Sequence, residues 1–411
     1  MDGKKILFIS YDGMTDPLGQ SQVIPYLSNL SKYGYSFVIL SCDKPEKYVA
    51  GKAYVEKLIA PFDIQWVSIP YHKKPPVLSS LYDFYILKKT AKKLHALHQF
   101  DMVHTRQGLP SLAGIYLKNK FGIKFLNDIR GFWADERVEG GIWSLKNPVL
   151  KKVYHFFKQH EKECLLKTDY SVCLTNKAKE IIQARTDIPG QPIPVEVIPC
   201  SVDMELFNPA KVDATLKATF ATKLNISDSD FIISYLGSIG GWYLTDEMMR
   251  FCKAVSDRIP TAKFLFISPN DCDVITSAAA KCGLAKDKLI VQCAKRHEVP
   301  VLLSFSSYSI FFIKPCYSKL ASSPTKHGEI MAMGIPVIAN SGVGDVAEII
   351  TSCHAGFVLT DFSPAAYNDI INKIEKQIPF DLAAIRDGAK KFYALETAAA
   401  RYKKVYDTIF S

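Results

Sequence analysis

The sequence lacks the long apolar runs and the paired cysteines that would point to a membrane-spanning or disulfide-bonded protein. No segment approaches the roughly 18 consecutive apolar residues of a membrane-spanning helix. The apolar run Ile6–Ile9 is too short for the core of a secretory signal. The cysteines stand singly, with no Cys-x-x-Cys pair, which argues against a zinc or disulfide framework. We therefore expect a cytoplasmic protein whose thiols are reduced.

Internal repeats and low-complexity tracts are also missing, which excludes solenoid and fibrous classes. What remains is the composition of an ordinary globular protein, with 48% hydrophobic and 22% charged residues in a chain of 411. At roughly 100 to 200 residues per domain, this length predicts two or three domains, and we expect two.

Positive charge is concentrated in two segments, 86–95 and 145–167, within a chain of net charge +10. The second segment can form a helix in which an apolar stripe runs beside lysines. These segments are either surface helices with solvated lysines or attachment sites for an anionic membrane face that carries a lipid-linked acceptor. Nucleic acid is not an expected partner, because no basic patch is interleaved with the aromatic residues of a recognisable module.

Strand-like apolar runs alternate with helical patterns in both halves of the chain, which predicts parallel α/β sheets. The residues in between, 185–230, are rich in proline and polar residues and suit a linker. We expect two Rossmann-like domains, 1–208 and 209–391, with ligands bound in a cleft at the carboxyl ends of the strands. The end of the chain, about 392–411, is predicted as part of one long helix that can pack back on the first domain. The predicted strands are 4–10, 36–42, 102–105, 123–128, 170–175, 231–237, 262–268, 288–293, 299–305, 308–314 and 335–340.

The segment 322–350, SSPTKHGEIMAMGIPVIANSGVGDVAEII, has the most informative local pattern. Thr325 can cap a short helix whose first turn carries Lys326, so that backbone N–H groups and a cation face a phosphate together. Glu329 lies on the same face, and a carboxylate there suits the two hydroxyls of a ribose. Gly334 can end this helix, and Asp345 can cap the next one. The alternative is a plain helix-strand-turn-helix with a surface lysine and glutamate.

These residues resemble the donor-binding signature of family 4 of the retaining glycosyltransferases, in a branch with Ser-Pro-Thr-Lys followed by Glu-x-Met-Ala-x-Gly-x-Pro-Val-Ile-Ala. The resemblance implies the GT-B fold, in which two Rossmann-like domains face each other across a cleft. It also implies that a nucleotide sugar is held mostly by the second domain, and an acceptor mostly by the first. Further matches, in the same order as in the family, are YDGMTDPLGQSQV (11–23), FDMVHTR (100–106), NDIRGFWADERVEGG (127–141), VIPCSVDMELFNP (197–209) and YLGSIGGWYLTDEM (235–248).

By position, the resemblance assigns Glu329 to the ribose hydroxyls and the loop around Gly19 to the diphosphate or the acceptor. A second phosphate-facing loop is implied at 237–242, with Gly237, Ser238, Gly240 and Gly241. Glycine suits such loops because it has no Cβ to obstruct close backbone contact.

The chain departs from the family at two positions. Many relatives have an arginine and a lysine there, which neutralise the diphosphate, whereas this chain has Ser238 and Tyr243. Lys326 is the expected substitute cation, since the charge that develops on the leaving group needs aimed donors. Arg296 and Lys314 are second choices. No cofactor and no metal is expected. Ala321 replaces an acid that contacts the donor sugar in relatives, which leaves the sugar undetermined.

Charged residues follow the strand 123–128 and should lie at its carboxyl end, on the ligand side. Asp128 can orient an acceptor hydroxyl or take its proton, and Arg130 can bind an anion. The alternative is a structural ion pair between them. With Lys326, these two are the catalytic candidates; the other acceptor-side candidates are His104, Arg106, Glu136 and Arg137.

The expected function is transfer of a hexose-type sugar from a UDP- or GDP-sugar to an acceptor hydroxyl with retention, in surface-glycan or glycolipid assembly of the bacterial type. Two alternatives remain open. One is a catalytically degenerate nucleotide-sugar-binding regulator or partner subunit. The other is an epimerase or inverting transferase of the same fold. A dinucleotide oxidoreductase is disfavoured, because no Gly-x-Gly-x-x-Gly follows the first strand.

Overall fold

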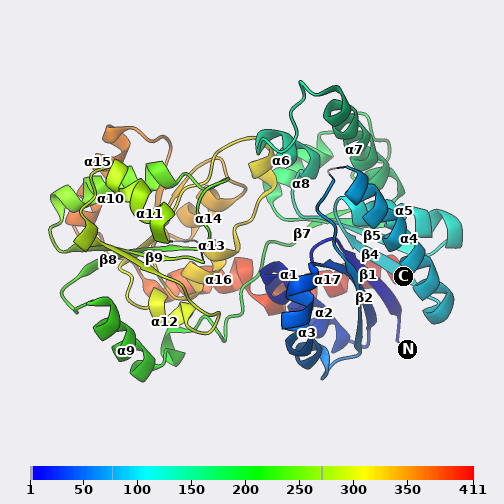
Figure 1. Ribbon diagram of the computed structural model, residues 1–411, viewed down its shortest axis with the longest axis horizontal. Helices are drawn as coiled ribbons and strands as arrows, with labels where there is room; N and C mark the ends of the chain where they lie inside the picture. The colour runs from blue at the N-terminus through cyan, green and yellow to red at the C-terminus, as the bar shows by residue number, and fades with distance from the viewer. Residues whose placement is uncertain (1–2, 76, 270–271) are drawn as a thin grey trace. The chain divides into compact units, whose positions relative to one another are not determined.

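The computed structural model describes residues 3–75, 77–269 and 272–411 and shows two compact units (Figure 1). Unit 1 consists of Met1–Pro199 together with Leu395–Ser411, and unit 2 of Cys200–Ala394. Each unit contains one parallel sheet with its helices, so the predicted α/β class with two Rossmann-like domains is confirmed. The units divide at 199 and 394, where the sequence patterns suggested 208 and 391.

Unit 1 is built on a sheet of seven parallel strands within the described residues, in the order β3-β2-β1-β4-β5-β6-β7. Because the order reverses between β1 and β4, the loops that leave their carboxyl ends diverge and open a place for a ligand. The strands are β1 (Lys5–Ser10), β2 (Ser36–Asp43), β3 (Ile64–Pro70), β4 (Met102–Arg106), β5 (Lys124–Ile129), β6 (Tyr170–Cys173) and β7 (Val195–Val197). The helices are α1 (Pro17–Gln22), α2 (Ile24–Ser31), α3 (Pro45–Ile59), α4 (Leu78–His98), α5 (Leu109–Phe121), α6 (Trp133–Glu139), α7 (Pro148–Lys167), α8 (Asn176–Gln183) and α17 (Leu395–Phe410).

Unit 2 repeats this plan with six parallel strands among its described residues, in the order β10-β9-β8-β11-β12-β13. The reversal here lies between β8 and β11. The strands are β8 (Phe231–Leu236), β9 (Ala262–Ile267), β10 (Leu289–Gln292), β11 (Tyr308–Phe311), β12 (Val337–Asn340) and β13 (Gly356–Leu359). The helices are α9 (Ala214–Leu224), α10 (Thr245–Arg258), α11 (Cys272–Lys281), α12 (Val299–Leu303), α13 (Thr325–Ala332), α14 (Val346–Ser352), α15 (Pro364–Glu375) and α16 (Leu382–Tyr393), with 3-10 turns at Pro209–Lys211, Lys286–Lys288 and Tyr317–Ala321.

The strands at the sheet centres are continuous apolar runs because helices cover both of their faces. In β1 every residue after Lys5 is buried, and all four residues of β12 are buried. The turn from α13 into β12 uses Gly334 at φ 72°, a conformation that side chains other than glycine rarely adopt. A glycine stop was predicted there.

Three predictions about local structure are wrong. Residues 299–305 do not form a strand; α12 lies there, because a right-handed connection between the parallel strands β10 and β11 needs a crossover element. The helical spacing of Val23, Leu27 and Leu30 predicts one helix over 21–34 that ends at Gly34, but the structure divides this stretch at Val23 into α1 and α2. The final helix is also divided, because Ala394 has an extended ψ of 135° between α16 and α17.

Helix α17 joins the core of unit 1, where it lies against α2, and Figure 1 shows it in red among the blue elements of that unit. Its inward side chains, Ala398, Tyr402, Val405, Tyr406 and Ile409, share one apolar cluster with residues of β1 and β2. The last residues of the chain therefore complete the first domain.

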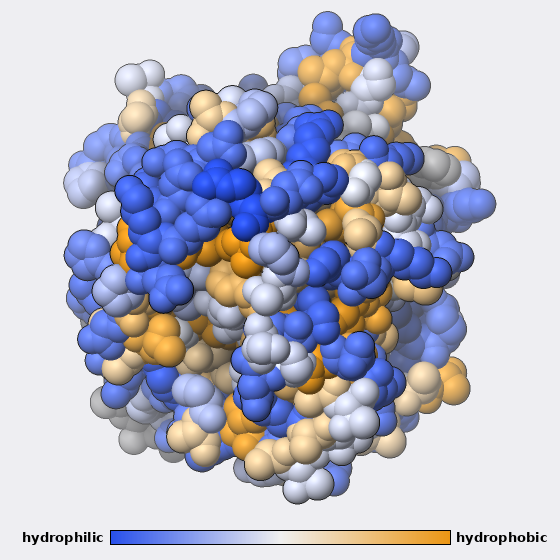
Figure 2. Space-filling model, turned by 90° about the vertical axis from the view of Figure 1, so that its left-hand side faces the viewer, coloured by the Kyte–Doolittle hydropathy of each residue, from blue (hydrophilic) through white to orange (hydrophobic). Residues whose placement is uncertain are grey.

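The surface of unit 2 is mostly polar on the face seen in Figure 2, where apolar side chains form small separate groups. Exposed large apolar residues of this unit include Val274, Tyr317, Ile378 and Leu382. Within the described ranges, none of the helices combines the length and apolar composition needed to cross a membrane.

Candidate functional site

Helix α13 carries the two residues that the sequence assigned to a nucleotide, Lys326 and Glu329. Both side chains are buried. The predicted capping role of Thr325 is wrong, because Pro324 occupies the cap position and no side chain caps this helix. Thr325 is instead the first helical residue, so its backbone N–H is one of the groups that a helix leaves unpaired at its start.

The ammonium group of Lys326 lies between two tyrosines. Its Nζ donates a hydrogen bond of 3.1 Å to the hydroxyl of Tyr235 and lies 3.8 Å from the ring centre of Tyr243. Burial lowers the pKa of Lys326 to about 7, although the nearby charge of Glu329 acts in the opposite direction. Near pH 7 this amine is therefore only partly protonated, and an anion bound beside it would favour the charged form.

The glycine-rich loop after β8 lies directly against this lysine. Gly237 has φ 115°, and a Cβ placed on it would come 2.8 Å from Nζ of Lys326. The loop is also tied back to its strand, because the hydroxyl of Tyr235 donates to the carbonyl oxygen of Ser238. Gly240 and Gly241 continue the loop with positive φ angles. The structure thus brings together the predicted phosphate loop and the predicted cation, while phosphate binding itself stays a prediction.

Lys319 is a second buried lysine at this loop, and no sequence pattern had indicated it. Its Nζ lies 3.8 Å from the ring centre of Trp242, the residue before Tyr243. Only its position seven residues before Lys326 could have suggested a role, because nothing in the sequence shows that it is buried. Two lysines from one short segment therefore cover two consecutive aromatic residues of the loop.

Glu329 forms an ion pair with Arg296, which lies in the loop after β10. The carboxylate is only 4% exposed, whereas the arginine is about half exposed and lies 4.7 Å from the ring centre of Phe207. Arg296 was a second choice for the cation that neutralises a diphosphate. The structure places it on the carboxylate of Glu329 instead, where it holds that group in one orientation.

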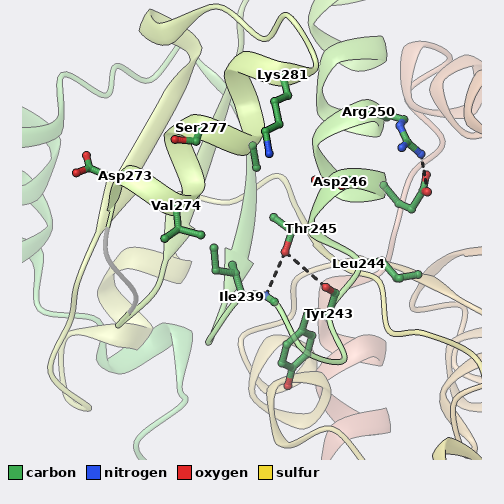
Figure 3. A pocket seen from close by; sticks show the side chains of 13 residues that line it. Ile239, Tyr243, Leu244, Thr245, Asp246, Arg250, Asp273, Val274, Ser277 and Lys281 are labelled. Atoms are coloured by element: carbon green, nitrogen blue, oxygen red, sulfur yellow. Dashed lines mark hydrogen bonds and ion pairs between the residues drawn. The ribbon is translucent and has the colours of Figure 1, made fainter. Parts of the chain in front are cut away.

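A cavity of about 720 Å³ borders the glycine-rich loop of unit 2. Thr245, the first residue of α10, stands at its centre in Figure 3 and fixes the loop: its hydroxyl accepts from the N–H of Gly240 at 3.2 Å and donates to the carbonyl of Tyr243 at 3.5 Å. Sequence patterns did not identify this cavity, because the way α10 and α11 pack on each other, which brings its lining residues together, cannot be read from their residue spacing. The lining residues are Ile239, Gly240, Tyr243, Leu244, Thr245, Asp246, Glu247, Arg250, Asp273, Val274, Ser277, Ala278 and Lys281.

In unit 1, a smaller cavity of about 230 Å³ lies near the carboxyl ends of β1, β4 and β5. It brings together four of the predicted acceptor-side residues, from β4 (Arg106), the loop after β5 (Arg130) and α6 (Glu136 and Arg137). The full lining is Tyr11, Asp12, Arg106, Gln107, Arg130, Gly131, Trp133, Glu136 and Arg137.

Asp128 and His104 are buried and do not line this cavity. Asp128 accepts a hydrogen bond of 3.0 Å from the hydroxyl of Tyr402 and lies 3.6 Å from Arg130. Burial alone would raise the pKa of Asp128, but Arg130, His104 and Arg106 outweigh it and lower the pKa to about 2. Such a carboxylate is a weak proton acceptor, which favours the structural ion pair over a catalytic role.

His104 contacts α17 rather than the cavity. Its Nδ1 is 2.8 Å from the hydroxyl of Tyr406, and burial lowers its pKa, so the ring is neutral near pH 7. Its place among core side chains favours a structural role, and its acceptor-side role stays a prediction.

Gly19 lies in the short helix α1, not in a loop. A Cβ there would come 2.4 Å from the carbonyl oxygen of Gly13 and 2.6 Å from Cα of Met14, so glycine lets α1 pack on this turn. Its approach to a diphosphate or an acceptor is not tested by these contacts. Among the side chains that the structure describes, no group of three or more histidines, cysteines or carboxylates could hold a metal ion.

Unit 2 is similar in sequence to a known protein family. The sequence model of the family "Glycosyl transferases group 1" matches residues 217–391, almost the whole of that unit. This domain is a group 1 glycosyl transferase domain. The resemblance inferred from the motifs is therefore confirmed at the level of the family. No curated protein matches the chain.

Solved structures similar to the whole chain are GT-B proteins, so the predicted GT-B fold is confirmed. A glycosyltransferase from Rickettsia africae aligns over 100% of both chains with a TM-score of 0.71 and 18% identity. Sucrose-phosphate synthase from Thermosynechococcus elongatus covers 99% of both chains, with a TM-score of 0.73 and 16% identity. Anabaena Alr3699/HepE, in complex with UDP and glucose, covers 98% of this chain and 100% of its own, with a TM-score of 0.71 and 13% identity.

In this glycosyl transferase domain one of the two positions that lack an expected cation has a lysine neighbour. The resemblance implies a lysine at the position of Tyr243, and Lys326 lies over the ring of this tyrosine. The residue before it, Trp242, has Lys319 over its ring. The positive charge at the loop thus comes from the segment before and within α13 instead of from the loop itself.

Proposed function

We propose that this protein is a retaining glycosyltransferase that moves a hexose-type sugar from a UDP- or GDP-sugar to an acceptor hydroxyl. The observation that supports it best is the arrangement on α13: Lys326 against the loop at Gly237, with Glu329 one turn further along. An ammonium group and a glycine turn suit a diphosphate, and a fixed carboxylate suits the two ribose hydroxyls.

In the proposed reaction, the bond between the anomeric carbon and the diphosphate oxygen breaks, and a bond to the acceptor oxygen forms on the same face. The acceptor proton passes to the departing diphosphate, so the protein need not supply a nucleophile or a base. The pKa of about 2 for Asp128 agrees with this scheme, because that carboxylate is a poor base near pH 7. Lys326 and Lys319 would stabilise the charge that develops on the leaving group.

UDP is the first nucleotide to test, because the similar Anabaena protein was solved with UDP and glucose. In a thermal-shift panel of UDP, GDP and ADP, one nucleotide should raise the melting temperature by binding the native state. Glu329→Gln should weaken that nucleotide about tenfold, since hydrogen bonds to charged groups contribute about 1.5 to 3 kcal/mol. Asp369→Asn, an exposed carboxylate on α15, is the matched control.

Turnover decides between this proposal and its alternatives. Incubation with the matching nucleotide sugar and an acceptor, followed by NMR of the anomeric proton, should give a product of unchanged configuration. Inverted product would assign an inverting transferase, and a sugar epimerised on its nucleotide would assign an epimerase. Tight nucleotide-sugar binding without turnover would assign the degenerate regulator or partner subunit, which the residues Ser238, Tyr243 and Ala321 motivate.

We also propose that unit 1 attaches to an anionic membrane surface, as expected for an enzyme of surface-glycan or glycolipid assembly. Helices α4 and α7 both carry exposed apolar side chains beside lysines. On α4 these are Leu78, Leu81, Tyr82, Tyr85 and Leu97, and on α7 Val149, Phe156 and Leu166. Vesicles with anionic lipid should pellet the protein and neutral vesicles should not, and Lys92→Ser with Lys93→Ser should weaken the binding. Equal pelleting with both vesicle types would contradict this attachment.

A further inference from the structure

Arg137 is a partly buried guanidinium: Glu136 and Asp12 act on its charge, but no carboxylate in the described parts of the chain forms a close ion pair with it. Its one hydrogen bond there runs from Nη1 to the carbonyl oxygen of Trp133, at 3.4 Å. Its Cζ stacks 3.4 Å from the ring centre of Trp133, which fixes the plane of the group. Burial lowers the pKa of Arg137 to about 10, so the side chain still carries its charge at pH 7. Most of its five N–H donors therefore point to no protein acceptor.

Arg106 and Gln107 line the same cavity and are also incompletely paired. Among the described residues, the close ionic partner of Arg106 is Asp12, at 3.4 Å from Nε and beyond the usual hydrogen-bond length of about 2.7 to 3.2 Å. Oε1 of Gln107 is buried with no hydrogen-bond partner. The guanidinium donors of Arg106 and Arg137 thus line a cavity with few protein acceptors, where an anionic ligand could take their hydrogen bonds.

The charge and size of the cavity restrict that ligand. Three arginines (106, 130 and 137) and two carboxylates (Asp12 and Glu136) line it, which leaves one net positive charge. Its volume of about 230 Å³ is below the roughly 300 to 1,000 Å³ of pockets that enclose a whole small molecule. The cavity can therefore enclose a single anionic group and not an entire acceptor.

We infer that this cavity binds an oxyanion, a phosphate or carboxylate group, carried by the acceptor, with Arg106 and Arg137 as its ligands. The planar fork of arginine matches such groups with paired hydrogen bonds. The inference rests on the proposed transferase function and narrows its acceptor: the sugar is added to a hydroxyl of an anionic molecule, such as a sugar phosphate, a lipid phosphate or a uronic acid.

Glucose 6-phosphate, glucuronate and glucose are the probes that test it, in thermal-shift and calorimetric titrations of the full chain at constant ionic strength. We expect the anionic sugars to bind at least tenfold more tightly than glucose. Binding of glucose 6-phosphate but not glucuronate would identify the anionic group of the acceptor as a phosphate, and the reverse would identify it as a carboxylate. Arg137→Gln and Arg106→Gln should each weaken the anionic probe about tenfold or more. Lys57→Gln removes one exposed charge from α3 and should change nothing.

Two variants keep the test valid if one of them fails to fold, which circular dichroism reports. The inference is overturned if glucose binds as well as the anionic sugars, or if neither arginine variant weakens them. The nucleotide response, measured in the same samples, separates this result from the proposed function. Wild-type protein that binds a nucleotide but no anionic sugar overturns the inference alone. Protein that binds anionic sugars through Arg137 but neither binds nor turns over nucleotide sugars overturns the transferase function alone.

Discussion

Lys326 lies buried between two tyrosine rings, and the nearby charge of Glu329 only partly offsets its burial, so an anion that reached the glycine-rich loop would stabilise the charge further. The sequence was sufficient to select this lysine and Glu329, because both lie within one short helix and a recognisable motif. It could not show the burial of Lys326, which depends on Tyr235 and Tyr243, about ninety positions earlier in the chain. For the same reason Lys319 was missed, since its aromatic partner comes from that distant loop as well.

We predict that nucleoside diphosphate affinity falls as pH rises through the range from about 7.5 to 9. In the free protein the pKa of Lys326 is about 7, so the amine is largely neutral there and must take up a proton when the diphosphate binds. One proton taken up weakens binding by up to about tenfold per pH unit. The two tyrosines around Nζ do not titrate in this range, because burial raises the pKa of Tyr235 and of Tyr243.

Isothermal titration calorimetry in buffers of different ionisation enthalpy measures both the affinity and the proton uptake. The diphosphate itself is fully ionised in this window, because phosphate groups have a second pKa of about 6. Lys326→Met should bind more weakly at pH 7.5 and show a flat profile up to pH 9. A flat profile in the wild-type protein would contradict the proposed role of this ammonium group.

At the scale of elements, α17 depends on buried polar contacts with the sheet of unit 1. Tyr402 donates to Asp128, Tyr406 contacts His104, and the hydroxyl of Tyr35 donates to Asp407 at 2.9 Å. The helical spacing of apolar residues was enough to predict that this helix exists and can pack back. The division at Ala394 was not predictable, because alanine is a strong helix former and only the packing of two separate units requires an extended residue there.

We predict that Asp128 stabilises unit 1 near neutral pH and that this stabilisation disappears in acid. The pKa of Asp128 is about 2 in the folded protein and about 3.9 in an unfolded chain. A lowered pKa contributes stability at pH values above the unfolded pKa, about 2 to 3 kcal/mol in this case, and that contribution is lost as pH falls from about 4 to 2. Asp128→Asn should therefore lower the free energy of unfolding at pH 7 and flatten its dependence on pH between 4 and 2.

Urea unfolding followed by tryptophan fluorescence can report this change, because Trp66, Trp133 and Trp143 lie in unit 1. Tyr402→Phe, which removes one hydrogen bond to the same carboxylate, should cost about 1 kcal/mol. Glu180→Gln, on the exposed side of α8, is the control and should leave the acid dependence unchanged. Equal acid dependence in wild type and Asp128→Asn would show that another group governs acid stability.

Other element predictions failed where a short apolar run fits two structures. Residues 299–305 are apolar except for Ser304, and such a run does not distinguish a strand from a buried helix by its period alone. Residues 299–303 are helical because they connect β10 to β11, and the order of these strands in the sheet cannot be read from the local sequence. β3, β7 and β13 were not predicted. β7 and β13 have only three and four residues, and β3 has seven but only two of them are buried, so it lacks a continuous apolar run.

At the scale of the whole molecule, the two units differ in whether one continuous segment of the chain is enough to form them. Unit 2 is one continuous segment, Cys200–Ala394, whereas unit 1 needs both ends of the chain. Most of the residues predicted to bind the donor, among them Gly237, Arg296, Lys326 and Glu329, lie in unit 2. The family match begins at residue 217, so it omits Val202 and Phe207, both of which are buried in the core of this unit.

We predict that a fragment of residues 200–394 folds alone and binds the same nucleotide as the full chain, whereas residues 217–391 do not form a stable domain. Val202 donates its backbone N–H to Tyr393, and Arg386 donates to the carbonyls of Met204 and Phe207. Loss of a buried phenylalanine alone costs about 3 to 5 kcal/mol, a large part of the roughly 5 to 15 kcal/mol that stabilises a domain.

Calorimetric melting of both fragments, with and without the nucleotide, measures this difference. Phe207→Ala within 200–394 should lower the melting temperature while the fragment still responds to the nucleotide, because Phe207 contacts Arg296 and not the lysines at the loop. Equal melting temperatures for the two fragments would show that residues 200–216 do not contribute to the core. A nucleotide response that needs the full chain would place part of the donor site in unit 1, where Gly19 is the first residue to substitute.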